Sequence, residues 1–569
     1  MTRSDSHSFL SSGPADDQGT QHRGSRLFRF FQRLVARPKP PRFPDPLLDI
    51  TGPRTYPVLT EDTSVALRPI SFVTVHFCDD YYHNLLRSAC VQNPLNQLVT
   101  VDNRWGHQFD TLSAAITSGL QQTIHDLVAV VHEDVLLPPG WQHRLQRSLT
   151  HLTEADPNWG LAGSVGWDKD GTHVGHWSDP HRYRDTLEDR DFGQVPRVDE
   201  QILIFRKSRG LTFDPMLPSI HNIGHDLTAK LAQSGQKTYA VNAPTIHKYA
   251  DETGTPIETA MASAKIRTRT HPANLAEWAC SNDYLYAKWP QWRPKDDPVE
   301  DLTQPADLTR YPPPVILLSR GGSGSRLLSV LAADLGLFLG NDVNASGDAM
   351  DMSQAIYRAI LATYQQRVDW QRKTVIPRLQ AHAAKMLDQA APTHPSGFTW
   401  GFKLPESLLV LPQIEQAFPN ARYVHMLRDP LATCLRRTHM TARFDNAIGR
   451  TAIRAAYAHC GRPIAQSLQD SPALHMAYTT RHQIESTLRF AQDRLQSRYL
   501  EIRFEDLLGD PTATRKAVAD WLGIAPVGTA LNDTIDPERA AKPKTTYDPQ
   551  IVAHTTDALA TLRKTLGYV

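Results

Sequence analysis

The stretch Pro314–Leu328, PVILLSRGGSGSRLL, constrains the fold of this chain more than any other. A short apolar strand runs into a loop of glycine and serine, and the loop opens a helix. This arrangement turns several backbone N–H groups and a helix N-terminus toward one point, where a phosphate or sulfate group binds. The loop lacks the Gly-Lys-Ser/Thr ending of nucleotide triphosphatases, because Ser325 is followed by Arg326. A glycine turn between two core elements would give the same pattern, so the loop alone leaves both interpretations open.

Two later segments bear on this choice. Ala421–Thr438, ARYVHMLRDPLATCLRRT, is a hydrophobic strand that ends at Arg428 and leads into a basic helix. An arginine suits phosphate at such a place because its planar guanidinium pairs with two oxygens at once. Tyr499–Pro511, YLEIRFEDLLGDP, is a further strand followed by an acidic turn.

In this order, the three segments resemble sulfotransferases that use 3′-phosphoadenosine-5′-phosphosulfate (PAPS). The resemblance implies PAPS as the sulfuryl donor, with the loop at its 5′ end and Arg428 at its 3′-phosphate. The chain departs from the family at Gly322, where many members carry Arg or Lys, and at Arg436, where Ser is usual. Either Thr433 or Thr438 replaces that hydroxyl, or Arg436 contacts the phosphate directly. The predicted donor-binding residues are Ser319, Arg320, Gly321, Gly322, Ser323, Gly324, Ser325, Arg326, Arg428 and Thr438.

Sulfuryl transfer needs charge stabilisation and a base for the acceptor hydroxyl. Arg320 is the predicted catalytic cation of the loop. Asp348, in the segment NASGDAMD, lies where related bacterial sulfotransferases carry an acid on the acceptor side. Lys403 and Glu406, in KLPE, resemble the family's K-x-P element, so Lys403 would support the sulfate and Glu406 would act as base. An ordinary surface carboxylate remains the alternative for each acid.

Composition limits the class of protein. A chain of 569 residues with 40% hydrophobic residues predicts two or three globular domains. The formal charge of +1 argues against a polycation that binds nucleic acid. The five cysteines are scattered along the sequence and form no C-x-x-C pair, which favours a reducing compartment over a disulfide scaffold. With no long apolar run and a polar N-terminus, we expect a cytoplasmic protein, with peripheral contact to the inner face of the membrane as an option.

Four regions are predicted. Residues 1–60 form a disordered segment that includes SRLFRFFQRLVAR at 25–37, a basic amphipathic helix. That helix suits either an anionic membrane surface or packing on the adjacent domain. Residues 65–292 form a first domain in which strands and helices alternate, which predicts a parallel sheet with covering helices. Residues 293–313 form a Pro-rich acidic linker, and residues 314–569 form the sulfotransferase domain.

The strand LVAVV in the first domain ends at His132-Glu133-Asp134. Carboxylates at the carboxyl end of a parallel strand lie where such sheets bind ligands. Asp134 could hold Mg²⁺ or Mn²⁺ against a diphosphate, because hard cations prefer carboxylate and phosphate oxygens. A strand-end turn with solvated acids would give the same tripeptide.

Eight ordered segments of this domain resemble family-2-type glycosyltransferases of the GT-A fold: SFVTVHF, TVDN, HEDV, LAGSVGW, VDEQILIFRK, FDP, GHDL and IHKY. The resemblance implies a nucleotide-sugar donor, a metal held by Asp134 and His247, and nucleoside contacts from Asp102 and Asn103. It also implies that Asp226 is the general base of an inverting transfer, since a carboxylate activates the acceptor hydroxyl. The histidines His132, His221 and His225 are expected to be hydrogen-bonded loop or core residues and are excluded from the metal site.

The sequence therefore predicts a bifunctional α/β enzyme, with a GT-A-type domain followed by a P-loop-like sulfotransferase domain around a parallel sheet. It would transfer a sugar and a sulfuryl group to a glycan or a lipid-linked glycan, and the fusion would favour consecutive steps. The alternative is a glycan- or nucleotide-binding protein in which only one domain is active. A nucleotide kinase is disfavoured by the missing Gly-Lys-Ser/Thr ending.

Overall fold

The computed structural model describes residues 64–179, 182–188, 190–218, 220–247, 272–293, 306–364, 369–535 and 547–568. The amphipathic helix predicted at 25–37 and most of the linker predicted at 293–313 lie outside these residues. Within the described part of the chain, no helix is both long enough and apolar enough to cross a bilayer. All of the described residues belong to one compact unit, Pro44–Val569.

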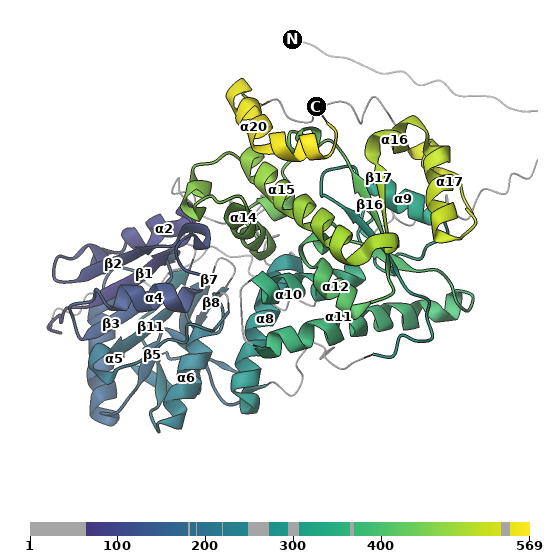
Figure 1. The fold of residues 1–569 in the computed structure, drawn as a ribbon. Coiled ribbons are helices and arrows are strands. Elements are labelled where there is room, and N and C mark those ends of the chain that lie inside the picture. Colours follow the sequence, from purple (N-terminus) through teal and green to yellow (C-terminus); the bar gives the residue numbers. More distant parts are fainter. Residues whose placement is uncertain are drawn as a thin grey trace, which may run out of the picture. The chain divides into compact units, whose positions relative to one another are not determined.

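The N-terminal region is built on a seven-stranded sheet in the order β2–β1–β3–β11–β5–β12–β9, counted over the described residues (Figure 1). Its strands are β1 (Ser71–His76), β2 (Gln97–Asp102), β3 (Leu127–Val131), β5 (Leu161–Gly163), β9 (Phe192–Gln194), β11 (Ile202–Arg206) and β12 (Thr238–Val241). The runs SFVTV and VAVV are buried because helices cover both faces. Helix α5 (Trp141–Ala155) packs on one face, and α4 (Leu112–Leu120) and α6 (Ile223–Gln233) pack on the other.

The expectation of a parallel sheet is only partly correct for this region. Strand β1 is parallel to β2 and β3, but β11 runs antiparallel to both β3 and β5. A parallel pair needs a crossover connection of a dozen or more residues. Strand β10 (Arg197–Val198) is joined to β11 by only three residues, Asp199–Gln201. This connection is too short to contain a crossover helix, so β11 joins the sheet without one. The sheet is mixed.

A smaller sheet brings distant residues together at the end of β3. It has the order β10–β6–β7–β13–β4, with β8 (Arg182–Asp185) paired to β7. Its other strands are β4 (Val135–Leu136), β6 (Val165–Trp167), β7 (His173–Asp179) and β13 (Thr245–His247). In the antiparallel pair of β13 and β4, His247 lies opposite Val135. This register places His247 next to the His132–Asp134 turn.

Over its described residues, the C-terminal region has a four-stranded sheet in the order β15–β14–β16–β17, and every pair is parallel, which confirms the prediction of a parallel sheet there. The strands are β14 (Val315–Ser319), β15 (Gly401–Lys403), β16 (Arg422–Leu427) and β17 (Tyr499–Arg503). Side chains alternate between two cores. One core contains α10 (Ser353–Tyr364), α11 (Asp369–Ala390) and α12 (Leu411–Ala417); the other contains α9 (Arg326–Asp334), α17 (Pro511–Leu522) and α18 (Ala530–Thr534).

Two further helices of the C-terminal region are α14 (Ala447–His459) and α15 (Pro472–Phe490). Helix α15 is followed by a π-helical turn at Ala491–Leu495. Further helices of the C-terminal region are α13 (Pro430–Cys434), α16 (Phe504–Gly509) and α20 (Pro549–Thr565), with 3₁₀ turns η7 (Pro405–Leu409) and η8 (Met440–Ala442). The 3₁₀ turn η4 (Pro290–Trp292) follows the N-terminal sheets, and α2 (Asp79–Leu86) and α3 (Ala89–Gln92) lie in the N-terminal region.

Helix α8 (Pro272–Lys288) follows the N-terminal sheets in sequence but packs with the C-terminal helices. Its Ala273, Ala276 and Cys280 belong to the same buried cluster as α10 and α11. Asp283 of α8 forms ion pairs with Arg358 of α10 and, at 3.1 Å, Arg378 of α11. The domain boundary predicted at residue 292 stays a prediction. Helix α8, which lies before that boundary in the sequence, contacts the core of the C-terminal region.

Candidate functional site

The loop from Ser319 to Arg326, called here the 319–326 loop, connects β14 to α9 as predicted. Gly322 and Gly324 have φ values of +93° and +95°, which side-chain-bearing residues rarely adopt. At Gly324 a Cβ atom would stand 2.3 Å from the Phe504 ring, so no other residue fits there. The loop is thus held in a tight concave shape between β14 and the start of the helix.

Two serine hydroxyls test whether this loop suits the anionic group of PAPS. Ser319 is fully buried and Ser323 is 2% exposed, and neither Oγ has a hydrogen-bond partner among the described residues. Buried hydroxyls without a partner are costly unless a ligand satisfies them. Together with the glycine cradle and the α9 N-terminus, these hydroxyls fit a phosphosulfate group. Arg326 is exposed at the first position of α9, close enough to Lys403 to lower that lysine's pKa.

Arg320 does not lie open to a ligand. Its Nε donates to Thr480 Oγ1 at 3.1 Å and its Nη2 to Thr479 Oγ1 at 2.9 Å, both on α15. Its Nη1 lies 3.1 Å from Nδ1 of His439. The side chain is 2% exposed, and burial lowers the pKa of Arg320 to about 10. The geometry favours a role in which Arg320 fixes the loop to α15 and orients His439, rather than the predicted direct contact with the donor.

The predicted residues Asp348, Lys403 and Glu406 do come together. Lys403 Nζ lies 2.5 Å from Asp348 Oδ1, and burial is the main cause that lowers the pKa of Lys403. Glu406 is 2% exposed, and its Oε1 lies 3.5 Å from Nε2 of His439. Burial, helped by the charge of Asp348, raises the pKa of Glu406 to about 7. Burial also lowers the pKa of His439 well below its usual value, so this histidine is neutral at pH 7.

Arg428 lies at the end of β16, as predicted, and its guanidinium carbon stands 4.3 Å from the centre of the Phe504 ring. Burial and then the neighbouring charge of Arg436 lower the pKa of Arg428. The positive charge of Arg436 thus acts on Arg428, and an anion bound by both side chains would offset this repulsion. Thr433 Oγ1 donates to Asp429 O at 3.0 Å inside α13, whereas Thr438 is half-buried in the segment after α13. Arg436 is therefore the better candidate for the second phosphate contact.

Three side chains that could hold a metal ion, called here the metal-binding group, lie in the N-terminal region at the end of β3. One ligand atom from each of His132, Asp134 and His247 lies within 4.8 Å of the others. His247 Nε2 stands 3.1 Å from Asp134 Oδ2, and the rings of the two histidines have centroids 6.2 Å apart. His132, which is left out of the predicted metal site, thus lies with its two predicted ligands. The intervening Glu133 points elsewhere and accepts hydrogen bonds from the backbone N–H groups of Phe77 (2.6 Å) and Cys78 (3.0 Å).

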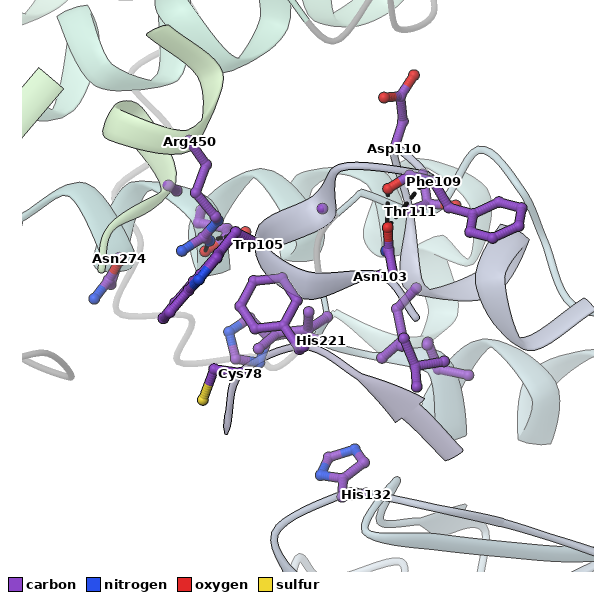
Figure 2. A pocket seen from close by; sticks show the side chains of 18 of the residues that line it. Cys78, Asn103, Trp105, Phe109, Asp110, Thr111, His132, His221, Asn274 and Arg450 are labelled. Carbon is purple, nitrogen blue, oxygen red and sulfur yellow. Dashed lines mark hydrogen bonds and ion pairs between the residues drawn. The ribbon is translucent and has the colours of Figure 1, made fainter. Parts of the chain in front are cut away.

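The metal-binding group opens into a cavity of about 1610 Å³ (Figure 2). The cavity reaches the carboxyl ends of β1 and β3 and the segment that follows β2. Asn103 lines the cavity and is 4% exposed, but its side chain organises the next residues: Oδ1 accepts from the N–H groups of Gln108 (3.0 Å) and Phe109 (2.8 Å). Asp102 pairs with Arg104 at 2.9 Å and is not among the lining residues.

Asp226 is not placed as the predicted base requires. It is 1% exposed, lies outside the cavity lining, and is bound to Lys288 Nζ at 2.6 Å and to the indole N–H of Trp289 at 2.8 Å. The first turn of α6 directs this carboxylate toward α8 and η4, where a cation neutralises it. Glu200 lines the cavity instead, in the turn between β10 and β11. Burial and the charge of Asp199 raise the pKa of Glu200 to about 8.

The sequence analysis missed His132, His439 and Glu200. For His132 a signal was present, because a ligand two residues before Asp134 in an irregular turn can face the same point. For Glu200 the signal was weaker: it sits in VDEQ, within a segment used for the resemblance but given no role. His439 comes directly after the segment ARYVHMLRDPLATCLRRT, outside every motif used for the resemblance. Its place at the 319–326 loop is seen only from its packing on Gly321, where a Cβ atom would lie 2.1 Å from the histidine ring.

The C-terminal region combines a buried strand, a glycine-rich loop and a helix on a parallel sheet, with Arg428 at the end of the next strand and Arg436 after α13. Among protein families, the model of the sulfotransferase family matches residues 323–527. This C-terminal region therefore belongs to the sulfotransferase family, and the family implies sulfuryl transfer with PAPS as donor.

Among solved structures, the sulfotransferase domain from the curacin biosynthetic pathway is similar, with 16% identity over 44% of this chain and 98% of that one, and a TM-score of 0.27. Sulfotransferase STF1 from Mycobacterium tuberculosis H37Rv has 12% identity over 52% and 90% of the two chains, with a TM-score of 0.30. GalNAc-T7, solved with UDP, GalNAc and Mn²⁺, has 16% identity over 41% of this chain and 53% of its own, with a TM-score of 0.25. No curated protein matches the sequence.

Proposed function

We propose that the C-terminal region transfers the sulfuryl group of PAPS to a hydroxyl of a glycan. The observation that carries the proposal is the 319–326 loop beside the start of α9, where the buried Ser319 and Ser323 hydroxyls have no hydrogen-bond partner within the described part of the chain. The backbone N–H groups of the loop and Arg326 would hold the 5′ end of the donor. Arg428 and Arg436 would hold the 3′-phosphate, because the charge of Arg436 acts on Arg428 and a bound anion would offset it.

Glu406 is the base that we favour for the acceptor hydroxyl. Asp348 is neutralised by Lys403, whereas the raised pKa of Glu406 gives this carboxylate a proton affinity close to the working pH. His439, at 3.5 Å, orients Glu406 and is itself fixed by Arg320. Lys403 places a positive charge beside the loop, where negative charge grows as the donor bond breaks.

Replacement of Arg428 by alanine tests the 3′-phosphate site. Because a charge-assisted contact contributes roughly 1.5 to 3 kcal/mol, we expect 3′-phosphoadenosine 5′-phosphate (PAP) to bind about 10- to 150-fold more weakly. Adenosine 5′-phosphosulfate lacks the 3′-phosphate and should bind as before. Calorimetric titration of both ligands measures the difference, with Arg422→Ala, at the other end of β16, as the matched control. Equal losses for both ligands would remove Arg428 from this site.

A second function is favoured by the metal-binding group. We propose that the N-terminal region has a GT-A-type fold and transfers a sugar from a nucleotide-sugar donor. Two imidazoles and one carboxylate suit Mn²⁺ better than Mg²⁺, which prefers oxygen ligands alone. The ion would neutralise charge on the leaving diphosphate. Glu200, which lines the same cavity, replaces Asp226 as our candidate for the base that takes the acceptor proton, and its use implies inversion at the anomeric carbon.

The joint proposal is a bifunctional transferase with a 65–292 and a 314–569 domain, acting on a glycan or lipid-linked glycan in the cytoplasm and not on nucleic acid. Mass spectrometry of products after incubation with nucleotide sugars, PAPS and cell-derived glycolipids tests it. Products that carry both a new sugar and a sulfate ester support it. A product with one modification alone would support the alternative, in which one region only binds its ligands.

The segment at 25–37 gives a further expected result. Four arginines beside an apolar stripe should bind anionic vesicles, and salt should weaken this binding. Deletion of residues 1–40 should abolish co-sedimentation with vesicles and leave turnover of a soluble acceptor unchanged. Full-length protein that does not sediment with anionic vesicles at low salt would leave packing on the adjacent domain as the role of this segment.

A further inference from the structure

One wall of the cavity is the segment Asn103–Thr111, called here the 103–111 loop, which joins β2 to α4. Trp105 and Gly106 in this loop have φ values of +53° and +76°. A bulky residue in the left-handed region is strained and keeps that conformation only where its surroundings hold it. The Asn103 hydrogen bonds to Gln108 and Phe109 hold the loop from inside. The remaining contacts on Trp105 come from elsewhere in the chain.

Those contacts come from Phe444 in the C-terminal region and from Phe77 in the N-terminal region, whose backbone carbonyl also accepts the Trp105 N–H at 2.9 Å. The Phe444 ring stacks on Trp105 with centroids 5.7 Å apart and planes 14° from parallel. The Phe77 ring, at the end of β1, meets the edge of Trp105 at 5.6 Å. Arg454 of α14 pairs with Asp110 at 2.5 Å, and its Nη2 would lie 3.4 Å from a Cβ at Gly106. Both ends of the loop are therefore fixed by residues that lie more than three hundred positions away in the sequence.

Arg450 of α14 strengthens this arrangement. Its Nη2 pairs with Glu277 of α8 at 2.9 Å, its Nη1 donates to Phe444 O at 3.1 Å, and its guanidinium carbon lies 5.2 Å from the centre of the Phe77 ring. Figure 2 shows Arg450 on the same side of the cavity as Trp105. The backbone that carries Phe444 is thus held in place at the cavity.

The 103–111 loop lies where the nucleoside of a donor would bind. The cavity meets the carboxyl ends of the parallel strands β1 and β2, which is the ligand-binding edge of such sheets. The flat rings of Phe77 and Trp105 line it and suit a planar heteroaromatic base. The metal-binding group in the same cavity suits a diphosphate.

We propose that Phe444 and Arg454 are positioning residues for this nucleoside diphosphate site, so that the N-terminal region needs α14 to bind its donor. The inference rests on the proposed glycosyl transfer. It names a role for two residues that lie within the sulfotransferase family match at 323–527 and are not among the predicted PAPS-site residues.

The test uses the full-length protein with Mn²⁺ and a panel of UDP, GDP, CDP and dTDP, titrated by calorimetry. We expect Phe444→Ala and Arg454→Gln each to weaken binding of the preferred diphosphate about 10-fold, since each removes one of two anchors of a strained loop. Phe444→Tyr, which retains the ring, should restore it. Binding of PAP should not change. Arg462→Gln is the matched control, because Arg462 follows the same helix, packs on Tyr478 and does not line the cavity.

A positioning role also predicts that these variants raise KM for the nucleotide sugar while kcat changes little, which general loss of folded protein would not produce. Unchanged diphosphate binding in both variants, with the unmodified protein binding normally, would overturn the inference and leave the proposed function intact. If Phe444→Ala also loses PAP binding, its loss of diphosphate binding no longer supports the inference. The diphosphate binding of Arg454→Gln then decides whether the inference stands. Failure of the unmodified protein to bind any diphosphate of the panel with Mn²⁺ would overturn the proposed glycosyl transfer itself, and the inference with it.

Discussion

Asp134→Ala should abolish sugar transfer, with a loss of about a thousandfold or more, while PAP binding stays as it was. The carboxylate would be the oxygen ligand of a metal held by His132, Asp134 and His247, and a metal contributes several kcal/mol of charge stabilisation to such a transfer. Mn²⁺-dependent binding of nucleoside diphosphates should disappear together with activity. Calorimetry with and without Mn²⁺, followed by product analysis, measures both effects.

Asp170→Ala is the matched control for this experiment, because Asp170 is exposed at the tip of the β6–β7 hairpin and does not line the cavity. Retained Mn²⁺-dependent transfer in the Asp134 variant would mean that the histidine pair binds no catalytic metal. Equal loss of PAP binding in a folded protein would show that the two sites are not chemically separate.

Glu406→Gln should lower the rate of sulfuryl transfer by about 10²- to 10⁴-fold, the usual contribution of a general base, without weakening PAP binding. In the unmodified protein the base must be ionised to act. Since the pKa of Glu406 is raised to about 7, the rate should rise as the pH increases through 7 and level off above it. The variant should lose this dependence. A rate profile from pH 5.5 to 9 at saturating PAPS measures it.

Asp348→Asn distinguishes the two predicted bases. This change removes the ion pair with Lys403, so a moderate loss of rate is expected. Because burial is the main cause that raises the pKa of Glu406 and the charge of Asp348 is the next, the pH dependence should persist but shift to lower pH. If Asp348→Asn abolishes that dependence and Glu406→Gln keeps it, Asp348 is the base and the assignment of Glu406 is wrong.

The elements that could be predicted from the sequence are those whose position depends on residues adjacent to them in the sequence. The loop after β14, Arg428 at the end of β16 and Asp134 at the end of β3 all follow buried strands, and local pattern alone places a residue at a strand end. Roles that depend on packing between distant elements could not be predicted. Asp226 follows the expected motif, yet Lys288 and Trp289 bind its carboxylate away from the cavity.

Both departures from the sulfotransferase pattern acquire a physical account. Gly322 occupies a position with φ +93°, where a longer side chain would be strained, so the basic groups at this loop come from its ends. Arg436 approaches Arg428 closely enough to lower its pKa, which suits a shared anion. Neither effect could be predicted from the amino-acid sequence alone, because each depends on backbone conformation or on three-dimensional proximity.

Helix α8 has a consequence for how this chain can be cut or recombined. Its apolar residues are part of the C-terminal core, and its end, with η4, neutralises Asp226 and Asp214 of the N-terminal region through Lys288. A fragment that ends at residue 292 would expose that apolar face to water, and one that begins at residue 314 would lack part of its core. Heat should therefore unfold both regions in a single cooperative transition, and exchange of either half for a homologous one would require α8 to be redesigned with it.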